Sequence, residues 1–289
     1  MTPVSILAIN GFGHLADLPC FKLKYAGASA VVSLYGGQVL SYKPKPDQET
    51  LWLSNLATWH NQQPIRGGIP ICWPWFGPIA PQLMPQPQNS QQLELQPQFT
   101  NHGLVRNRLW QLEQQHCEQS GAQIQLSISV NDLPYYPGTI KLFLTITLND
   151  TLRIRLNCDE DILQQAALHS YFKIRKLEQC KISPLPSQYQ DSLSQQLVNT
   201  SSNTLQIDQE VDRIYHHTEP DIQLQKDRHS ILISQEDHDA TVVWNPWQEK
   251  CALLKDAKPR DYLNFVCIET ARLALVAKPL ALSQTISCP

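Results

Sequence analysis

The sequence of 289 residues is short of charged residues and of long apolar runs. Charged residues make up 17% of the chain, the formal net charge is −3, and no block is rich in lysine or arginine. These absences argue against a nucleic acid or another large polyanion as the partner. No segment approaches the ~18 consecutive apolar residues of a membrane span, so we expect no contact with a membrane.

Several short motifs are also missing. The amino terminus lacks the basic start and apolar core of a signal peptide, and the eight cysteines include no CxxC pair. We therefore expect a cytoplasmic protein with reduced thiols, several of them in the core. The nucleotide-binding loop GxxxxGK[ST] is absent, and the sequence offers no clear site for a metal or a redox cofactor.

The middle of the chain alternates apolar and polar residues. Ile124–Val130, Ile140–Leu148 and Leu152–Cys158 each place apolar residues at every second position, and turn-forming residues separate them. A period of two is typical of strands that bury one face. We predict a three-stranded antiparallel meander over residues 124–158.

Further short strands are predicted along the chain, whereas amphipathic helices are scarce. Many short strands with proline-rich turns favour an all-β protein, a large antiparallel β-sandwich with few short helices. A sandwich of this size can form one domain, so we expect a single domain over residues 1–289. Two biased stretches, 81–98 and 188–203, are interpreted as long loops between strands. The additional strands are predicted at Ser29–Tyr35, Gly37–Tyr42, Thr50–Leu53, Trp110–Glu113, Ile231–Ser234, Thr241–Trp244, Phe265–Glu269 and Leu282–Ser287.

Residues 64–78 form the first segment that could carry chemistry. They combine three aromatic residues, four prolines and three glycines. The glycines that follow Arg66 allow backbone N–H groups to approach an oxyanion, and aromatic faces suit the apolar face of a sugar ring. The alternative is a tightly packed corner of the sandwich with buried tryptophans.

A histidine and a glutamate stand out in two later segments. If residues 167–172 form a strand, His169 and Tyr171 point to one face and the residues between them to the other. Glu269 ends an apolar run, where desolvation can raise the pKa of its carboxyl group and make it a better general base. Taken alone, each has an ordinary explanation, a buried histidine with one hydrogen bond or a glutamate that leaves its strand into solvent.

Taken together and in order, six segments resemble those of the aldose 1-epimerase (galactose mutarotase-like) family. The resemblance covers most of the chain and is greatest to the branch that acts on hexose 6-phosphates. It implies the large antiparallel supersandwich of that family. The segments are RGGIPICWPWFGP at 66–78, NHGLVRNRLW at 101–110, ALHSYF at 167–172, DRIY at 212–215, VVWNPW at 242–247 and NFVCIET at 264–270.

The resemblance also implies roles for individual residues. His169 matches the general acid, Glu269 the general base and His102 a second histidine of the site. Asp212 matches a ligand of the sugar hydroxyls. Two departures from the family pattern are Thr270, where a smaller residue is common, and the loose match at 256–261, which leaves Lys258 and Arg260 without a role.

The implied reaction interconverts the α and β anomers of a hexose 6-phosphate. A base removes the proton of the C1 hydroxyl while an acid protonates the ring oxygen, and neither a metal nor another cofactor is needed. Arg66 and Arg106 are expected to bind the phosphate of this substrate. A tryptophan wall from Trp73, Trp75 or Trp247 would hold the sugar.

Three other functions compete with this one. A carbohydrate-binding or sugar-phosphate-binding protein without turnover would have no need for an acid and a base facing one sugar carbon. A mutarotase of free hexoses would not need the arginine in the first segment. A glycoside hydrolase needs paired carboxylates, and only Asp212 could be forced into the second position. We expect a monomer, because no interface patch is evident.

Overall fold

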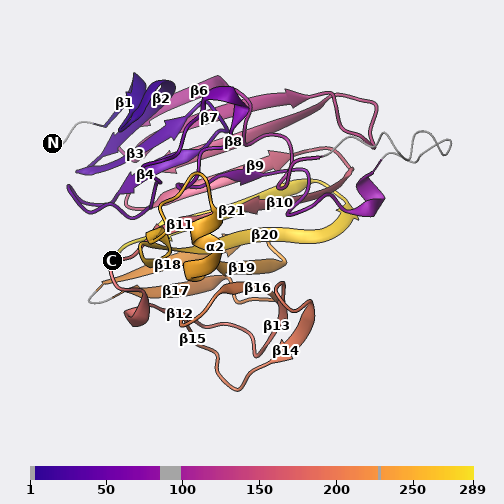
Figure 1. The fold of residues 1–289 in the computed structure, drawn as a ribbon. Coiled ribbons are helices and arrows are strands. Elements are labelled where there is room, and N and C mark those ends of the chain that lie inside the picture. Colours follow the sequence, from indigo (N-terminus) through magenta and orange to yellow (C-terminus); the bar gives the residue numbers. More distant parts are fainter. Residues whose placement is uncertain (1–3, 85–98, 227–228) are drawn as a thin grey trace.

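The computed structural model describes residues 4–84, 99–226 and 229–289, which form three antiparallel sheets with very little helix (Figure 1). The smallest sheet lies at the amino-terminal end of the chain and has four strands in sequence order. Its strands are β1 (Ser5–Phe12), β2 (Leu15–Tyr25), β3 (Ala28–Ser33) and β4 (Val39–Lys43).

A nine-stranded sheet contains the predicted meander, because β7 (Gly121–Val130), β8 (Ile140–Leu148) and β9 (Leu152–Cys158) pair in sequence order along one half of it. The last strand, β21, pairs with β9 and connects the meander to the other half. The strands follow one another in space as β15 (Leu205–Gln206), β12 (Lys181–Ser183), β17 (Asp221–Lys226), β18 (His229–Glu236), β21 (Leu280–Ser287), β9 (Leu152–Cys158), β8 (Ile140–Leu148), β7 (Gly121–Val130) and β6 (Gln111–Glu118).

The third sheet has eight strands and contains His169 in its gap between two strands and Glu269 on one of its strands. Its strand β20 (Phe265–Ala277) pairs with β19 (Ala240–Asn245) on one side. On the other side β20 pairs with β10 (Leu163–Leu168) and β11 (Tyr171–Lys173). The path runs β14 (Gln196–Asn199), β13 (Gln188–Asp191), β16 (Val211–His216), β19 (Ala240–Asn245), β20 (Phe265–Ala277), β10 (Leu163–Leu168) and β5 (Ile71–Cys72), with β11 (Tyr171–Lys173) paired only to β20.

The main core lies between the nine-stranded sheet and the two others, so the architecture is the large antiparallel β-sandwich that the sequence predicts. β2 and β3 pack on the meander, and β10 and β20 pack on β21. One cluster of buried residues extends from Leu23 to Ile286. Because this core is continuous, we propose that the chain forms a single domain.

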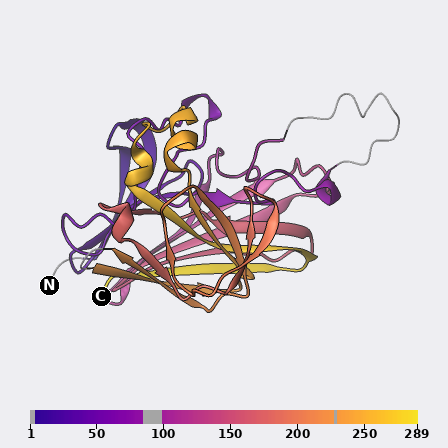
Figure 2. The same ribbon diagram turned by 60° about the horizontal axis from the view of Figure 1, so that its bottom comes forward.

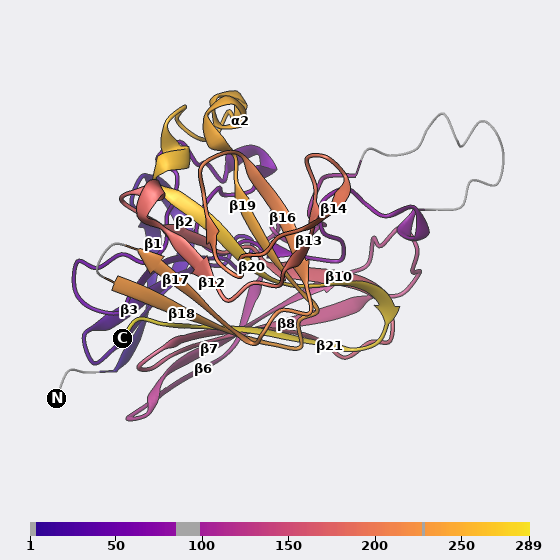
Figure 3. The same ribbon diagram turned by 90° about the horizontal axis from the view of Figure 1, so that it is seen from below.

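Helix is confined to short pieces in the described part of the chain. The α-helix α2 (Trp247–Leu253) follows β19, and Figure 3 shows it beyond the end of that strand. None of these helices is long and apolar enough to cross a membrane. The start of β1 and the carboxyl terminus lie on the same side of the molecule in the views of Figures 1 and 2. Four 3₁₀ turns occupy His60–Gln62, Pro81–Leu83, Leu177–Gln179 and Asp261–Leu263.

One predicted loop and one predicted strand differ from the structure. Residues 188–203 were interpreted as a loop, but β13 and β14 form a hairpin there, with Tyr189 buried beneath it. Thr50–Leu53 was predicted as a strand and makes only isolated bridges, Leu51 to Phe172 and Leu53 to Gly67. Most of the predicted loop 81–98 lies outside the described residues.

A buried polar contact joins the two layers. Gln284 of β21 accepts a hydrogen bond from the Ser170 hydroxyl at 2.5 Å and donates one to the Thr270 hydroxyl at 2.8 Å. All three side chains are buried. The amide therefore satisfies two hydroxyl groups that have no access to water.

We predict that Gln284→Leu lowers the free energy of unfolding by about 2 kcal/mol, because it leaves buried hydroxyl groups without partners. Urea unfolding of the variant and the native protein measures the difference. Gln223→Leu, at an exposed position of β17, is the matched control and should change little. Equal stabilities of the Gln284 variant and the native protein would contradict a structural role for this amide.

Candidate active site

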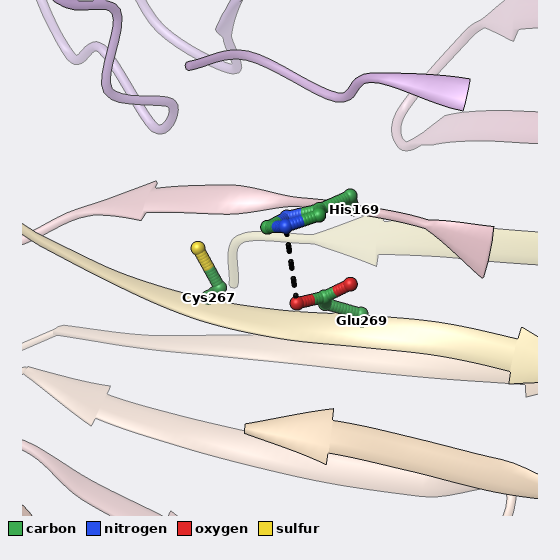
Figure 4. A group of neighbouring side chains, drawn as sticks. All are labelled: His169, Cys267 and Glu269. Atoms are coloured by element: carbon green, nitrogen blue, oxygen red, sulfur yellow. Dashed lines mark ion pairs between the residues drawn. The ribbon is translucent and has the colours of Figure 1, made fainter. Parts of the chain in front are cut away.

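The alternation of β20 places two polar side chains away from the main core. Val266 and Ile268 belong to the core, and Thr270 points to the same side, where it meets Gln284. Successive residues of a strand face opposite sides of the sheet. Cys267 and Glu269 therefore share the outer face of the eight-stranded sheet (Figure 4).

His169 lies beside Glu269 because it occupies the gap between β10 and β11, which both pair with β20. The Nε2 atom of His169 is 3.4 Å from Oε1 of Glu269, as the dashed line in Figure 4 marks. The Tyr171 ring stacks on the imidazole with centroids 4.8 Å apart and planes 7° apart. The prediction that His169 and Tyr171 share one face is thus confirmed, with Ser170 pointing to the other layer.

Both members of this pair are removed from water. Glu269 is 1% exposed and His169 is 8% exposed. Burial raises the pKa of Glu269 well above its usual value, and the nearby Asp212 carboxylate raises it further. Burial also lowers the pKa of His169 well below its usual value, with smaller contributions from His102 and Arg106. Each shift disfavours the charged form of its group.

Two atoms of the pair have no hydrogen-bond partner among the described residues. They are Oε2 of Glu269 and Nδ1 of His169, and both are buried. A buried polar atom without a partner costs about 1–3 kcal/mol of stability. Such atoms in a native protein indicate a ligand that completes their hydrogen bonding. The pair is therefore arranged to bind something polar.

His102 is held next to His169 by reciprocal hydrogen bonds with Gly77. Its backbone N–H donates to the Gly77 carbonyl at 2.8 Å, and its Nδ1 accepts from the Gly77 N–H at 3.3 Å. The two imidazole rings meet edge to face with centroids 5.5 Å apart. Burial, followed by the charges of Arg106 and Arg66, lowers the pKa of His102 to about 3. His102 is thus neutral, with its proton on Nε2 as a hydrogen-bond donor.

The glycine after His102 explains how this loop reaches the Trp73 segment. Gly103 forms a parallel bridge with Trp73 at φ +79°, in the left-handed region. A Cβ atom at this position would overlap the Trp73 carbonyl oxygen. Only glycine permits this approach. The close contact sets the distance between the His102 loop and residues 73–77.

Arg66 connects three parts of the chain at the edge of the site. Its Nε donates to Oδ1 of Asp256 at 2.5 Å, and a terminal nitrogen donates to the Tyr171 hydroxyl at 3.2 Å. Arg106 donates to the carbonyl of Asn101 at 2.8 Å. Both arginines are close enough to lower the pKa of His169. The partner role of Asp256 was missed, because residues 256–261 match the family pattern only loosely.

Asp212 joins the site through a row of paired residues. In the sheet register, Asp212 of β16 lies opposite Trp244, and Trp244 lies opposite Cys267. The Trp244 ring meets the rings of His169 and Tyr171 edge to face, each with centroids 6.2 Å apart. Burial raises the pKa of Asp212. Trp244 is therefore an aromatic residue beside the pair, together with Tyr171, whereas the sequence predicted Trp73, Trp75 or Trp247 for this place.

The prediction of Trp73 as a substrate wall is wrong. Its side chain is fully buried, and its indole nitrogen donates to Oε1 of Gln164 at 2.7 Å. Trp75 is also fully buried and donates to the Thr100 carbonyl at 3.0 Å. Both belong to the packed corner that was the alternative interpretation. Trp247 begins α2 and packs on Tyr262 with centroids 5.4 Å apart, so its contact with a sugar stays a prediction.

These features define a class of protein, a large antiparallel β-sandwich with a buried carboxyl–imidazole pair on the outer face of its eight-stranded sheet. The family model of aldose 1-epimerases matches residues 19–276. The chain belongs to the aldose 1-epimerase family, and it is accordingly an enzyme of the epimerase or mutarotase type.

Three proteins illustrate what this chain is similar to. A protein of Salmonella typhimurium named "Putative glucose-6-phosphate 1-epimerase" is 28% identical over 286 residues, which cover 94% of this chain and 91% of the relative. The crystal structure of a "putative mutarotase" from the same species has a TM-score of 0.85 at 26% identity, with 98% and 96% of the two chains covered. Galactose 1-epimerase from Lactobacillus acidophilus has a TM-score of 0.73 at 14% identity over 99% of each chain, a likeness of fold. The predicted galactose mutarotase-like fold is confirmed.

We predict that Gly103→Ala lowers the free energy of unfolding by at least about 2 kcal/mol, because the added methyl group separates the His102 loop from Trp73. Urea unfolding measures the loss. Gly77→Ala is the matched control, since Gly77 also has a positive φ of 65° but has nothing within 4 Å of an added Cβ. It should lose only about 1 kcal/mol from the backbone conformation. Equal losses in the two variants would show that the close approach is unimportant.

Proposed function

We propose that this enzyme interconverts the α and β anomers of a hexose 6-phosphate, with glucose 6-phosphate as the favoured substrate. The observation that carries the proposal is the buried contact of 3.4 Å between His169 and Glu269 in a chain of the aldose 1-epimerase family. The names of the relatives support the phosphorylated substrate.

Ring opening requires two proton transfers on one O–C–O unit. Glu269 takes the proton of the C1 hydroxyl while His169 protonates the ring oxygen, and the bond between C1 and the ring oxygen breaks. Rotation about C1–C2 presents the other face of the aldehyde, and ring closure returns both protons. Burial disfavours the carboxylate form of Glu269 and the imidazolium form of His169, so each charged form, once present, is a strong base or a strong acid.

The neighbouring residues hold the sugar during this rotation. Neutral His102 donates a hydrogen bond from Nε2 to a sugar oxygen, and Asp212 accepts one from a hydroxyl group. The face of Trp244 covers apolar C–H groups of the ring. These roles keep the open-chain aldehyde bound until the ring closes again.

A phosphate at C6 provides an anchor remote from C1. Arg66 is fixed in direction by Asp256 and by the Tyr171 hydroxyl, so its guanidinium group is ordered before a ligand arrives. Arg106 adds a second positive charge near the same imidazole. Planar guanidinium groups bind two phosphate oxygens at once. Two arginines beside an acid–base pair favour a phosphorylated hexose over a free one.

The alternative without turnover is a sugar-phosphate-binding protein. Such a protein needs hydrogen-bond donors and aromatic faces but gains nothing from a desolvated carboxyl–imidazole pair. Burying that pair costs stability, which catalysis would justify and binding alone would not. Measurement of anomer exchange separates the two functions directly.

We predict that Glu269→Gln slows anomer exchange of glucose 6-phosphate by about 10²–10⁴-fold, because the amide cannot accept the C1 hydroxyl proton. Magnetisation-transfer NMR between the two anomer signals measures the rate. The control is Glu118→Gln, at an exposed position of β6, which should exchange at the native rate. If the native protein does not exceed the rate in buffer, the proposed function fails.

We predict that Arg66→Ala lowers kcat/KM for glucose 6-phosphate by about 10–100-fold, from the loss of charge-assisted hydrogen bonds of about 1.5–3 kcal/mol. The value for free glucose should change much less, so the ratio of the two falls. Arg108→Ala is the control, because Arg108 is paired with Asp132. An unchanged ratio in Arg66→Ala would remove this arginine from phosphate recognition.

A further inference from the structure

The proposed reaction uses His169 and Glu269 but leaves Cys267 without a role. Cys267 is fully buried, two residues before Glu269 on the same face of β20. One potential ligand atom from each of the three side chains lies within 4.8 Å of the other two. Figure 4 shows the sulfur atom beside the imidazole and the carboxylate.

We propose that Cys267, His169 and Glu269 form a binding site for a zinc ion, which inhibits the enzyme when it is bound. A thiolate, an imidazole and a carboxylate are all regular ligands of zinc, whereas magnesium and calcium prefer oxygen ligands alone. Three protein ligands leave the fourth tetrahedral position for water or for a sugar hydroxyl.

The spacing of the first two ligands fits this ion. Zinc bonds to nitrogen and oxygen are about 2.1 Å long, so tetrahedral geometry separates two such ligands by about 3.4 Å. His169 Nε2 and Glu269 Oε1 are 3.4 Å apart. The sulfur lies within 4.8 Å of a ring nitrogen of His169 and of a carboxylate oxygen of Glu269. A zinc–sulfur bond of about 2.3 Å requires a separation of about 3.6 Å, so the sulfur has to approach by at most about 1 Å.

The unpartnered atoms of the pair add a second observation. Glu269 Oε2 and His169 Nδ1 are buried and have no hydrogen-bond partner among the described residues. Both atoms can therefore still form a hydrogen bond when a ligand enters the site. Binding replaces the thiol proton of Cys267, and any proton on the Glu269 carboxyl group, with the metal, and these protons are released to solvent.

Inhibition follows from which atoms the ion occupies. Zinc engages His169 Nε2 and Glu269 Oε1, the lone pairs that must exchange protons with the sugar. A bound ion and a proton cannot share these lone pairs, so zinc and catalysis exclude each other. This inhibition rests on the proposed function, whereas the binding of zinc rests only on the geometry.

Cobalt substitution tests the site directly. Co²⁺ added to the whole protein should bind once per chain and give the near-ultraviolet absorption band of a thiolate–cobalt bond. Displacement by Zn²⁺ then gives its affinity. In Cys267→Ser the band should disappear and the zinc affinity should fall by about 100-fold. Cys117→Ser, at an exposed cysteine, is the matched control and should keep the band.

The rate of anomer exchange completes the test. Zinc should slow exchange in the native protein at one equivalent per chain, and each variant is compared with its own zinc-free rate. A native protein without the thiolate band, or a Cys267→Ser variant with unchanged zinc affinity, overturns the proposal. A Cys267-dependent band in a protein that exchanges no anomers supports the metal site and removes the proposed function instead.

Discussion

Hydrophobic packing between the two layers of the sandwich is the constraint on which the rest of the structure depends. This packing buries every second residue at the start of β20, where Val266 and Ile268 belong to the main core. The residues between them must then face the other way. A shift of the register by one residue would exchange the two faces and place Glu269 between the layers. The candidate site is therefore fixed by the core beneath it.

The arrangement of the site lowers the stability of the folded protein. Glu269 and His169 are desolvated, and each keeps one buried atom without a protein partner. The surrounding apolar and aromatic residues offset this cost, with Trp52 stacked on Phe265 at 4.4 Å between centroids. The same desolvation moves both pKa values in the directions that suit a base and an acid. The burial of this pair thus lowers the stability of the fold and raises the reactivity of the two groups.

The sequence predicted those parts of the fold that depend on local pattern. The meander of β7–β9 follows from its period of two. His169 and Tyr171 share one face as the alternation predicts, although His169 lies in the gap between two strands. The pairing of distant segments left no such signal. A tryptophan-rich segment suits a sugar site and a packed corner equally well, and only the burial of Trp73 decides between them. The contact of Arg66 with Asp256 likewise depends on two loops that meet only in the folded chain.

The pairing of β9 with β21 has a consequence for synthesis of the chain on the ribosome. The meander can form as soon as residues 121–158 have emerged, but β9 gains its second neighbour only when residues 280–287 follow. Until then the backbone N–H and C=O groups along one side of β9 are open to pairing with another chain. The last strand thus protects the nascent sheet from aggregation, in addition to supplying Gln284 behind the site.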